Sequence, residues 1–330
     1  MSQQTNTPVK DSDWYILGAG SIGLLLASSL LQSGESVTLI LKYQSQLEHI
    51  KKNGGILFEK EDHRVLLPVK AITATMLPPC LSRLIIAVKA HQTLAAMQDV
   101  SSHLSAESLV ILAQNGMGTE EQLRKEFNQL NPVLASITHG AYQPERYHVI
   151  HAGMGECWLG CSDRLGPDQQ ELLKALYNTE LLVQWDTNIQ LRLWKKLIVN
   201  CCVNPLTAIL GCRNGDLLAH PQGPSLIRSI CLEILPVAQA ASISLSLGEM
   251  SLLVERVCTT TATNYSSMFQ DIQQGRMTEI DYLNGYVLRE AEKIYTHCPC
   301  NEMLTHMIHF MEQQRAVEVD GVCHIFGHKL

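Results

Sequence analysis

The chain has 330 residues, and 25 Lys and Arg against 32 Asp and Glu give it a net charge of −7. Hydrophobic residues make up 46% and charged residues 17%, and a charged share below the roughly 25% of an average domain excludes general disorder. At about 150 residues per domain the length indicates two domains, and an acidic chain without Lys/Arg clusters argues against nucleic acid or an anionic membrane as partner.

The cysteines and the first residues bear on the cellular compartment. The cysteine count of 11 is odd, and a chain of this length needs no disulfide staples. Residues 1–13 are polar and contain no apolar run like that of a signal peptide. We therefore expect a disordered N-terminal tail over residues 1–13, reduced thiols and a cytoplasmic location.

Residues 14–186 alternate short apolar runs with segments typical of helices. The expected strands are Trp14–Leu17, Ser36–Leu41, Leu84–Val88, Leu109–Ala113, Val133–Ile137 and Leu181–Trp185. The expected helices are Ser21–Ser33, which Gly34 closes, and Thr119–Phe127, while Gly55–Val69 and His148–Gly160 have the pattern of hairpins or edge strands. This alternation predicts an α/β fold with a Rossmann-type, doubly wound parallel sheet covered by helices on both faces.

The uncharged stretch between Asp13 and Glu35 is long enough to span a bilayer. However, Gly18, Gly20 and Gly23 interrupt it, and several serines are scattered through it. A strand, a tight turn and a buried helix explain these residues better than a membrane span.

Residues 187–330 have a helical pattern throughout. Thr187 can cap a helix that runs toward Pro205. The later segments that suit helices better than strands are Leu226–Ala241, Glu249–Gln270, Glu279–Tyr295 and Pro299–Val317. The sequence therefore predicts an all-helical second domain, with the boundary near Asp186.

A glycine-rich motif, Gly18-Ala19-Gly20-Ser21-Ile22-Gly23, lies between the first strand and the first helix. It fits G-x-G-x-x-G, in which the first glycine permits the turn and the second lets the backbone approach a pyrophosphate. The third lets the helix pack closely on the strand, with the helix N-terminus facing the anion. Because the flanking strands and helix are present, the motif favours dinucleotide binding over a glycine-rich turn without a ligand.

The end of the second strand discriminates between the two nicotinamide cofactors. NAD sites usually place an acidic residue there to bind the ribose hydroxyls, whereas this chain has Leu41-Lys42-Tyr43-Gln44. Lys42 is a cation where a 2′-phosphate would lie, and this favours NADP. The alternative is an ordinary surface lysine.

Polar residues also follow two later strands. Lys89 closes the strand from Leu84, and Asn115 closes the strand from Leu109. Ligands of doubly wound sheets bind outside the carboxyl ends of strands, so both side chains could contact cofactor and substrate. Each could equally be a helix-capping or turn residue.

The first helix of the second half carries polar residues in an apolar context, Trp194-Lys195-Lys196-Leu197-Ile198-Val199-Asn200. Lys196 and Asn200 are four residues apart and share one face. Such groups are costly to bury unless they meet a ligand or each other. A lysine that extends along the helix to solvent explains Lys196 equally well.

Together these segments resemble the 2-dehydropantoate 2-reductase (ketopantoate reductase) family, from about Trp14 to about Gln314. The motifs that carry the resemblance are GAGSIG, VKAHQT, QNGMGTEEQL, WKKLIVNCCVNPLTA and SSMFQDIQQGRMTEIDYLNGYV. The resemblance implies a Rossmann domain over 14–186 and a helical substrate domain over 187–330, like that of 6-phosphogluconate dehydrogenase. It also implies the NADPH-dependent reduction of 2-dehydropantoate to (R)-pantoate, a step toward pantothenate and coenzyme A.

The resemblance further implies roles for individual residues. Lys196 corresponds to the general acid, and Glu279 to a glutamate that supports the lysine and the substrate. The residues matching substrate-binding positions are Asn115, Asn200, Asn204 and Ser267, and those matching cofactor-binding positions are Gly18 to Gly23, Lys42, Lys89 and Asn115. The Lys42 position is often arginine in the family, so a bidentate phosphate contact is lost.

No metal site is expected. The histidines and cysteines near the C-terminal end, His297, Cys298, Cys300, His306, His309, Cys323 and His324, fit no standard zinc spacing. The expected partners are the cofactor and a small-molecule substrate. The chain is expected to be a monomer or a homodimer.

Two other functions remain open at this point. A related NADP-dependent reductase could act on another branched 2-oxo acid. A non-catalytic NADP-binding redox sensor needs the glycine loop but has no use for Lys196 or Glu279.

Overall fold

The computed structural model describes residues 13–319, with side chains as far as residue 314. Contacts divide the chain into two compact units. The first runs to Gln114 and continues over Thr119–Ile189, and the second comprises Asn115–Gly118 and the residues from Gln190 on. Apart from Asp13, the expected tail lies outside the described residues. Asp13 is buried and accepts hydrogen bonds from Thr38 Oγ1 (2.9 Å) and Lys70 Nζ (3.1 Å).

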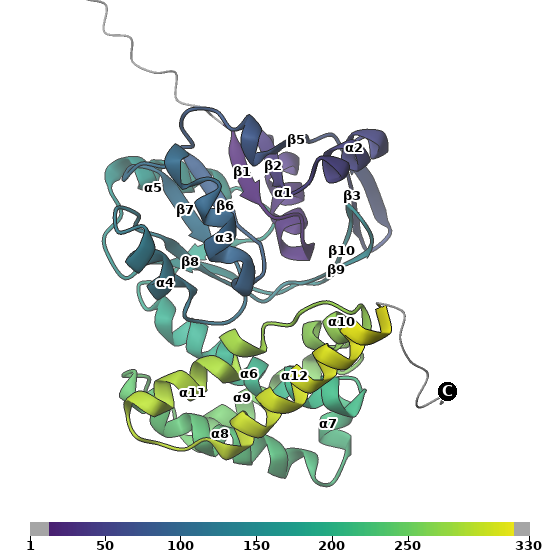
Figure 1. Ribbon diagram of the computed structural model, residues 1–330, viewed down its shortest axis with the longest axis vertical. Helices are drawn as coiled ribbons and strands as arrows, with labels where there is room; N and C mark the ends of the chain where they lie inside the picture. Colours follow the sequence, from purple (N-terminus) through teal and green to yellow (C-terminus); the bar gives the residue numbers. More distant parts are fainter. Residues whose placement is uncertain (1–12, 320–330) are drawn as a thin grey trace, which may run out of the picture. The chain divides into compact units, whose positions relative to one another are not determined.

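The first unit is built on an eight-stranded sheet with the order β12-β11-β8-β7-β6-β1-β2-β5 (Figure 1). Its strands are β1 (Trp14–Leu17), β2 (Val37–Leu41), β5 (Lys70–Thr73), β6 (Arg83–Ile86), β7 (Leu109–Leu112), β8 (Val133–Ile137), β11 (Cys157–Gly160) and β12 (Val183–Trp185). All neighbours are parallel except β8 and β11. The Rossmann-type prediction is confirmed, with this one antiparallel pair added.

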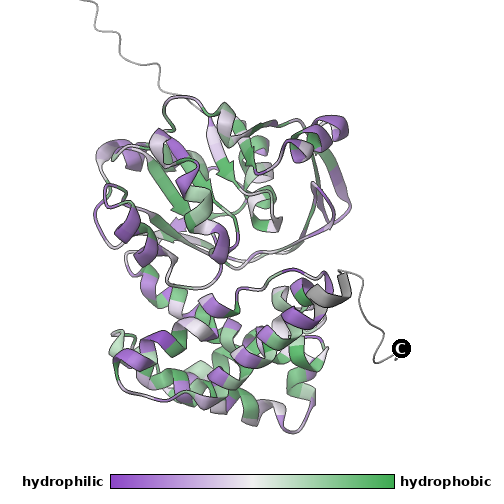
Figure 2. Ribbon diagram, in the orientation of Figure 1, coloured by the Kyte–Doolittle hydropathy of each residue, from purple (hydrophilic) through white to green (hydrophobic). Residues whose placement is uncertain are grey.

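The helices of this unit connect the strands. They are α1 (Ser21–Gln32), α2 (Gln44–Asn53), α3 (Thr93–Gln98), α4 (Thr119–Glu126) and α5 (Pro167–Tyr177), with short 3₁₀ turns η1 (Ala74–Met76), η2 (Ala90–Gln92) and η3 (Ser101–His103). The central strands are buried along their whole length and, apart from Arg83 at the start of β6, apolar, as parallel strands between helices are. Figure 2 shows this contrast, since the central strands are green and α2 is largely purple.

A smaller four-stranded sheet has the order β4-β3-β10-β9. Its strands are β3 (Ile56–Lys60), β4 (His63–Leu67), β9 (Gly140–Glu145) and β10 (His148–Gly153). The expected hairpin in Gly55–Val69 is confirmed by the antiparallel pairing of β3 and β4. The prediction for His148–Gly160 is wrong, because β10 lies inside the small sheet and β11 inside the large one.

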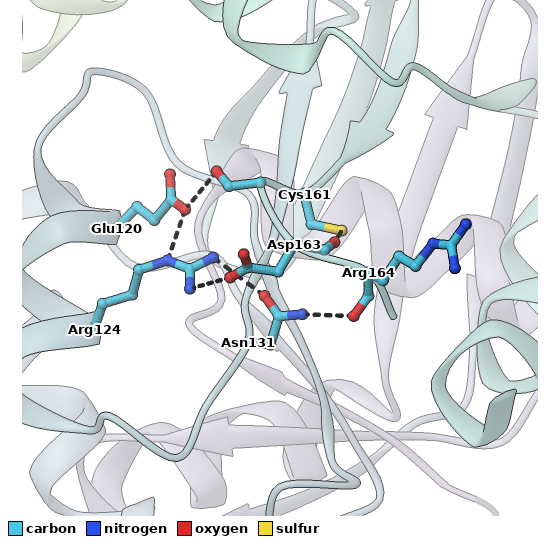
Figure 3. A network of polar contacts seen from close by, with 7 residues as sticks. Glu120, Arg124, Asn131, Cys161, Asp163 and Arg164 are labelled. Carbon is cyan, nitrogen blue, oxygen red and sulfur yellow. Dashed lines mark hydrogen bonds and ion pairs between the residues drawn. The ribbon is translucent and has the colours of Figure 1, made fainter. Parts of the chain in front are cut away.

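A polar network ties α4 to the loop after β11 (Figure 3). Arg124 donates hydrogen bonds to Glu120 Oε1 (2.9 Å), Asp163 Oδ2 (2.8 Å) and Asn131 Oδ1 (3.1 Å). The Asn131 side chain in turn donates to the carbonyl of Arg164 (3.2 Å). The network fixes the helix that begins immediately after Asn115–Gly118.

In the second unit every described element is helical, as predicted. The elements are α6 (Ile189–Leu210), α7 (Asp216–Ala219), α8 (Gly223–Ala240), α9 (Leu247–Thr260), α10 (Ser267–Gln273), η4 (Ile280–Tyr282), α11 (Asn284–Lys293) and α12 (Pro299–Val319). Their inner faces form one apolar core that includes Trp194, Ile198 and Ile234. None of the helices in the described residues is long and apolar enough to cross a membrane.

Three helix boundaries differ from the predictions. The single helix expected at Glu249–Gln270 is two helices, because Ser266 caps a new one by accepting from Phe269 N (3.1 Å). The segment from Glu279 begins with the 3₁₀ turn η4 before α11. Finally, α6 does not end at Pro205 but contains it and continues to Leu210.

Candidate functional site

The glycine loop has the geometry that its sequence predicts. Gly18 has φ +109°, and a Cβ there would lie 2.8 Å from Val88 Cγ1. A Cβ on Gly23 would lie 2.1 Å from the Gly18 carbonyl oxygen, so α1 packs directly against the loop. At Gly20 the nearest atom to such a Cβ is Ala87 O at 3.7 Å, an ordinary van der Waals contact. Of the three glycines, Gly20 is thus the one that packing does not require, and a close approach of a ligand is the physical reason that remains.

The residues expected to bind the cofactor follow the carboxyl ends of three adjacent strands of the large sheet. The glycine loop follows β1, whose neighbours are β2 and β6. Lys42 directly follows β2, and Lys89 follows β6. The chain order reverses between β1 and β6, which is the switch point where doubly wound sheets bind ligands.

The two lysines differ in their surroundings. Lys42 is exposed, and its Nζ lies 5.2 Å from the ring centroid of the exposed Tyr43. Lys89 is half-buried and precedes η2. No carboxylate stands between β2 and α2, so nothing acidic there would repel a phosphate.

The loop Asn115–Gly118 joins the helical unit through contacts with η4. Asn115 Nδ2 donates to Glu279 Oε2 at 3.2 Å, and Met117 N donates to Tyr282 O at 2.8 Å. Gly116 has φ +83°, and a Cβ there would lie 2.5 Å from Tyr282 O. This pairing of Asn115 with Glu279 was not foreseen, since no local pattern connects residues so far apart.

Helix α6 carries Lys196, Asn200 and Asn204 at successive four-residue steps, which place them along one face. Lys196 and Asn200 are half-buried and Asn204 is 7% exposed. Within the described part of the chain, the side-chain amides of Asn200 and Asn204 have no hydrogen-bond partner. Amides on such largely buried residues that have no protein partner are suited to a polar ligand.

The segment containing Ser267 is attached to the same helix. Ser266, not Ser267, caps α10, and the Thr207 hydroxyl on α6 donates to Ser266 Oγ at 2.7 Å. Ser267 is the first residue of α10 and is exposed. Sequence reasoning did not find the Thr207–Ser266 bond, although a serine three residues before the Phe269 amide is a capping pattern.

Two cysteines also lie on α6, between Asn200 and Asn204. The Cys201 and Cys202 side chains are fully buried, and burial raises the pKa of both thiols well above the usual value. Thiols held protonated in this way are poor nucleophiles. We therefore assign Cys201 and Cys202 a packing role in the core and no catalytic role.

The His/Cys segment at the start of the last helix makes hydrogen bonds to Glu233 on α8. Cys298 donates to the Glu233 carbonyl (3.5 Å), and Glu233 accepts from the backbone N–H of Cys300 (2.8 Å) at the start of α12. Among the described residues no group of His, Cys, Asp and Glu could hold a metal ion. Cys323 and His324 lie outside those residues.

Two family models match the chain: "Ketopantoate reductase PanE/ApbA" over residues 14–164, and "Ketopantoate reductase PanE/ApbA C terminal" over residues 188–312. A 2-dehydropantoate 2-reductase of Vibrio cholerae is 35% identical over 90% of this chain and 97% of the relative. The enzyme of Escherichia coli O157:H7 is 33% identical over 91% of this chain and 95% of its own.

Two solved structures are similar to the chain over almost its whole length. A ternary structure of D-mandelate dehydrogenase with NADH and anilino(oxo)acetate has a TM-score of 0.85 and 26% identity, covering 92% of this chain and 99% of its own. A probable 2-dehydropantoate 2-reductase from Bacillus subtilis has a TM-score of 0.77 and 28% identity, covering 91% and 99%. The chain belongs to the ketopantoate reductase family.

Proposed function

We propose that this protein reduces 2-dehydropantoate to (R)-pantoate with NADPH, a step toward pantothenate and coenzyme A. The observation that carries the proposal is the hydrogen bond between Asn115 and Glu279, which are 164 residues apart. It joins two polar motifs in the unit that also contains Lys196. Family membership and the near full-length match to named reductases support the same reaction.

The first unit fits a dinucleotide. Packing does not require glycine at position 20, whereas the close approach of a pyrophosphate to the N-terminus of α1 would. Lys42 would bind the 2′-phosphate, and Lys89 would contact the cofactor near the substrate. When bound, NADPH supplies the hydride that is added to C2 of the substrate ketone.

The second unit supplies groups for the substrate. Negative charge builds on the ketone oxygen as C2 accepts hydride, and the Lys196 ammonium stabilises this oxygen and then protonates it. Glu279 orients the lysine or a substrate hydroxyl. The neutral groups that would bind the substrate carboxylate and hydroxyl without adding charge are Asn115, Asn200, Asn204 and Ser267.

A second candidate is the reduction of another 2-oxo acid. The observation in its favour is the likeness to D-mandelate dehydrogenase, whose ternary structure contains NADH and anilino(oxo)acetate. That likeness also brings NADH into consideration, whereas Lys42 favours NADPH.

The experiment is cofactor oxidation followed by absorbance, with ketopantoate beside a panel of branched and aryl 2-oxo acids and with NADPH and NADH compared. We expect ketopantoate-selective turnover that prefers NADPH. Preference for an aryl 2-oxo acid with NADH would favour the second candidate. NADPH binding without turnover of any acid would indicate a redox sensor.

A further inference from the structure

Helix α6 contains a backbone defect at Pro205. Proline has no N–H, so the carbonyl of Cys201, four residues earlier, lacks its helical donor. The proline ring also crowds that carbonyl. Cys201 is fully buried, so water is not available to replace the missing bond.

Asn284, at the start of α11, supplies the missing donor. Its Nδ2 donates to Cys201 O at 3.0 Å and also to Asn301 Oδ1 at 3.0 Å. The orientation of the Asn301 amide is fixed independently, because its Nδ2 donates to Glu233 Oε2 at 2.8 Å. Asn284, like Asn301, is fully buried. The freed carbonyl of α6 is therefore held by a chain of hydrogen bonds through α11 and α12 to α8.

The defect lies between the polar groups of the site. Lys196 and Asn200 precede it on α6, and Asn204 immediately precedes Pro205. The path of the helix between Cys201 and Pro205 therefore sets the position of Asn204 relative to Asn200. A regular helix would fix that path through its own hydrogen bond, but here the bond comes from Asn284.

We propose that Asn284 is a positioning residue of this enzyme, which holds α6 at its proline defect and so keeps Asn200 and Asn204 in register for substrate. The inference rests on the proposed function of these asparagines. It predicts an effect on substrate turnover without an effect on cofactor affinity, because the glycine loop and both cofactor-type lysines belong to the other unit.

The test is Asn284→Ala, assayed at a temperature where the variant is fully folded. We expect kcat/KM for ketopantoate to fall about tenfold to hundredfold, since small misplacements of binding groups cost this much. The Kd for NADPH should not change. Unaltered kcat/KM in the folded variant would overturn the proposal and leave Asn284 a merely stabilising residue.

Val254→Ala is the control for lost stability. Val254 lies on α9, is fully buried in the core of the same unit, and has no polar group that could bind substrate. This variant should lose stability but keep its kcat/KM, and an equal catalytic loss would count against a specific role for Asn284.

Pro205→Ala provides a second and independent measurement. An alanine at 205 has an N–H that can bond to Cys201 O, so replacing Asn284 should cost less stability in this background. Urea unfolding of the two single variants and the double variant measures the coupling. Additive losses would overturn the proposal. If Asn284→Ala alone does not fold, the proposal requires the double variant to fold, and its failure to do so would also overturn it.

Failure of the proposed function would look different. In that case the unaltered protein would not reduce ketopantoate, whereas the coupling between Pro205 and Asn284 in urea would still be measured.

Discussion

Lys196 is the residue on which the proposed chemistry depends most, and its neighbour on the chain offers a control. We predict that Lys196→Ala lowers kcat by about 10²–10⁴-fold, the usual contribution of a general acid. The Kd for NADPH should be unchanged, because Lys196 is not among the cofactor-binding residues, and the glycine loop, Lys42 and Lys89 belong to the other unit. Steady-state kinetics and a cofactor titration measure both quantities. Lys195→Ala, which alters an exposed lysine, should leave both nearly unchanged. Unchanged turnover in Lys196→Ala would remove this lysine from the mechanism.

The glycines of the cofactor loop should fail in different ways. In Gly20→Ala the added methyl group makes only an ordinary contact, 3.7 Å from Ala87 O, and φ −77° already suits alanine, so stability should change little. The methyl group occupies the approach to the pyrophosphate, and we expect the Kd for NADPH to rise about tenfold or more. Gly23→Ala collides with the Gly18 carbonyl and should lower the free energy of unfolding by about 1–3 kcal/mol. Urea unfolding and cofactor titration separate the two effects, and equal behaviour of the variants would contradict this reading of the loop.

At the scale of elements, a hydrogen bond between two buried histidines links the small sheet to the segment that follows β8 of the large sheet. His139 lies between β8 and β9, and His151 lies on β10. His139 Nδ1 accepts from the Gly155 N–H (3.2 Å), so it carries no proton and must also accept from His151 Nε2 (3.1 Å). Burial lowers the pKa of both imidazoles, and the charge of Lys60 adds to this. Protonation of His139 would place an N–H on Nδ1, where it would face the Gly155 N–H and the donor at His151 Nε2.

This arrangement predicts a pH dependence of stability. A histidine whose pKa is lowered by folding binds fewer protons in the folded state than in the unfolded state. Its contribution is fully present above the unfolded pKa of about 6.5 and is lost as the pH falls below it. We expect the urea concentration at the unfolding midpoint to decrease when the pH is lowered from about 7.5 to about 5.5. The decrease should be smaller in His139→Asn, which keeps an acceptor for the Gly155 N–H. Exposed His63 is the control, and His63→Asn should retain the full pH dependence.

The sequence predicts elements well where the signal is local. The strand, glycine loop and helix from Trp14 to Gln32 follow from an apolar run, glycine spacing and an uncharged helix. The break between α9 and α10 also has a local signal that the prediction passed over, because the polar run TTTATN (259–264) ends one helix and Ser266 caps the next. The split of His148–Gly160 between two sheets depends on strand pairing, which no short window of sequence contains.

The same limit applies to the candidate site. Spacing on one helix predicts that Lys196, Asn200 and Asn204 share a face. No spacing predicts that Asn115 meets Glu279, or that Asn284 reaches the carbonyl freed by Pro205, because both contacts depend on tertiary packing.

At the scale of the whole molecule, each unit has its own core, but the chain does not divide at a single point. Asn115–Gly118 follows β7 of the sheet unit and makes its contacts with η4. We predict that the Met117 amide exchanges its hydrogen with solvent only when the helical unit opens, at the same rate as amides of that unit. In Val254→Ala, which removes two methyl groups from the core of that unit, Met117 and the amides of α11 should lose protection together. Hydrogen exchange followed by mass spectrometry measures this, and Met117 protection that persists while α11 loses its own would contradict the prediction.

The same short loop restricts how the two units can be inherited. A single crossover between Ile189 and Gln190 would transfer the helices of one parent but leave Asn115 with the other. Glu279 would then meet a loop with which it had not been selected. Recombination that keeps the pair from one parent requires further crossovers on both sides of the loop. In the gene the loop is encoded within the sheet unit, but in the folded protein it belongs to the helical unit. The two units of this enzyme are therefore not freely exchangeable between relatives.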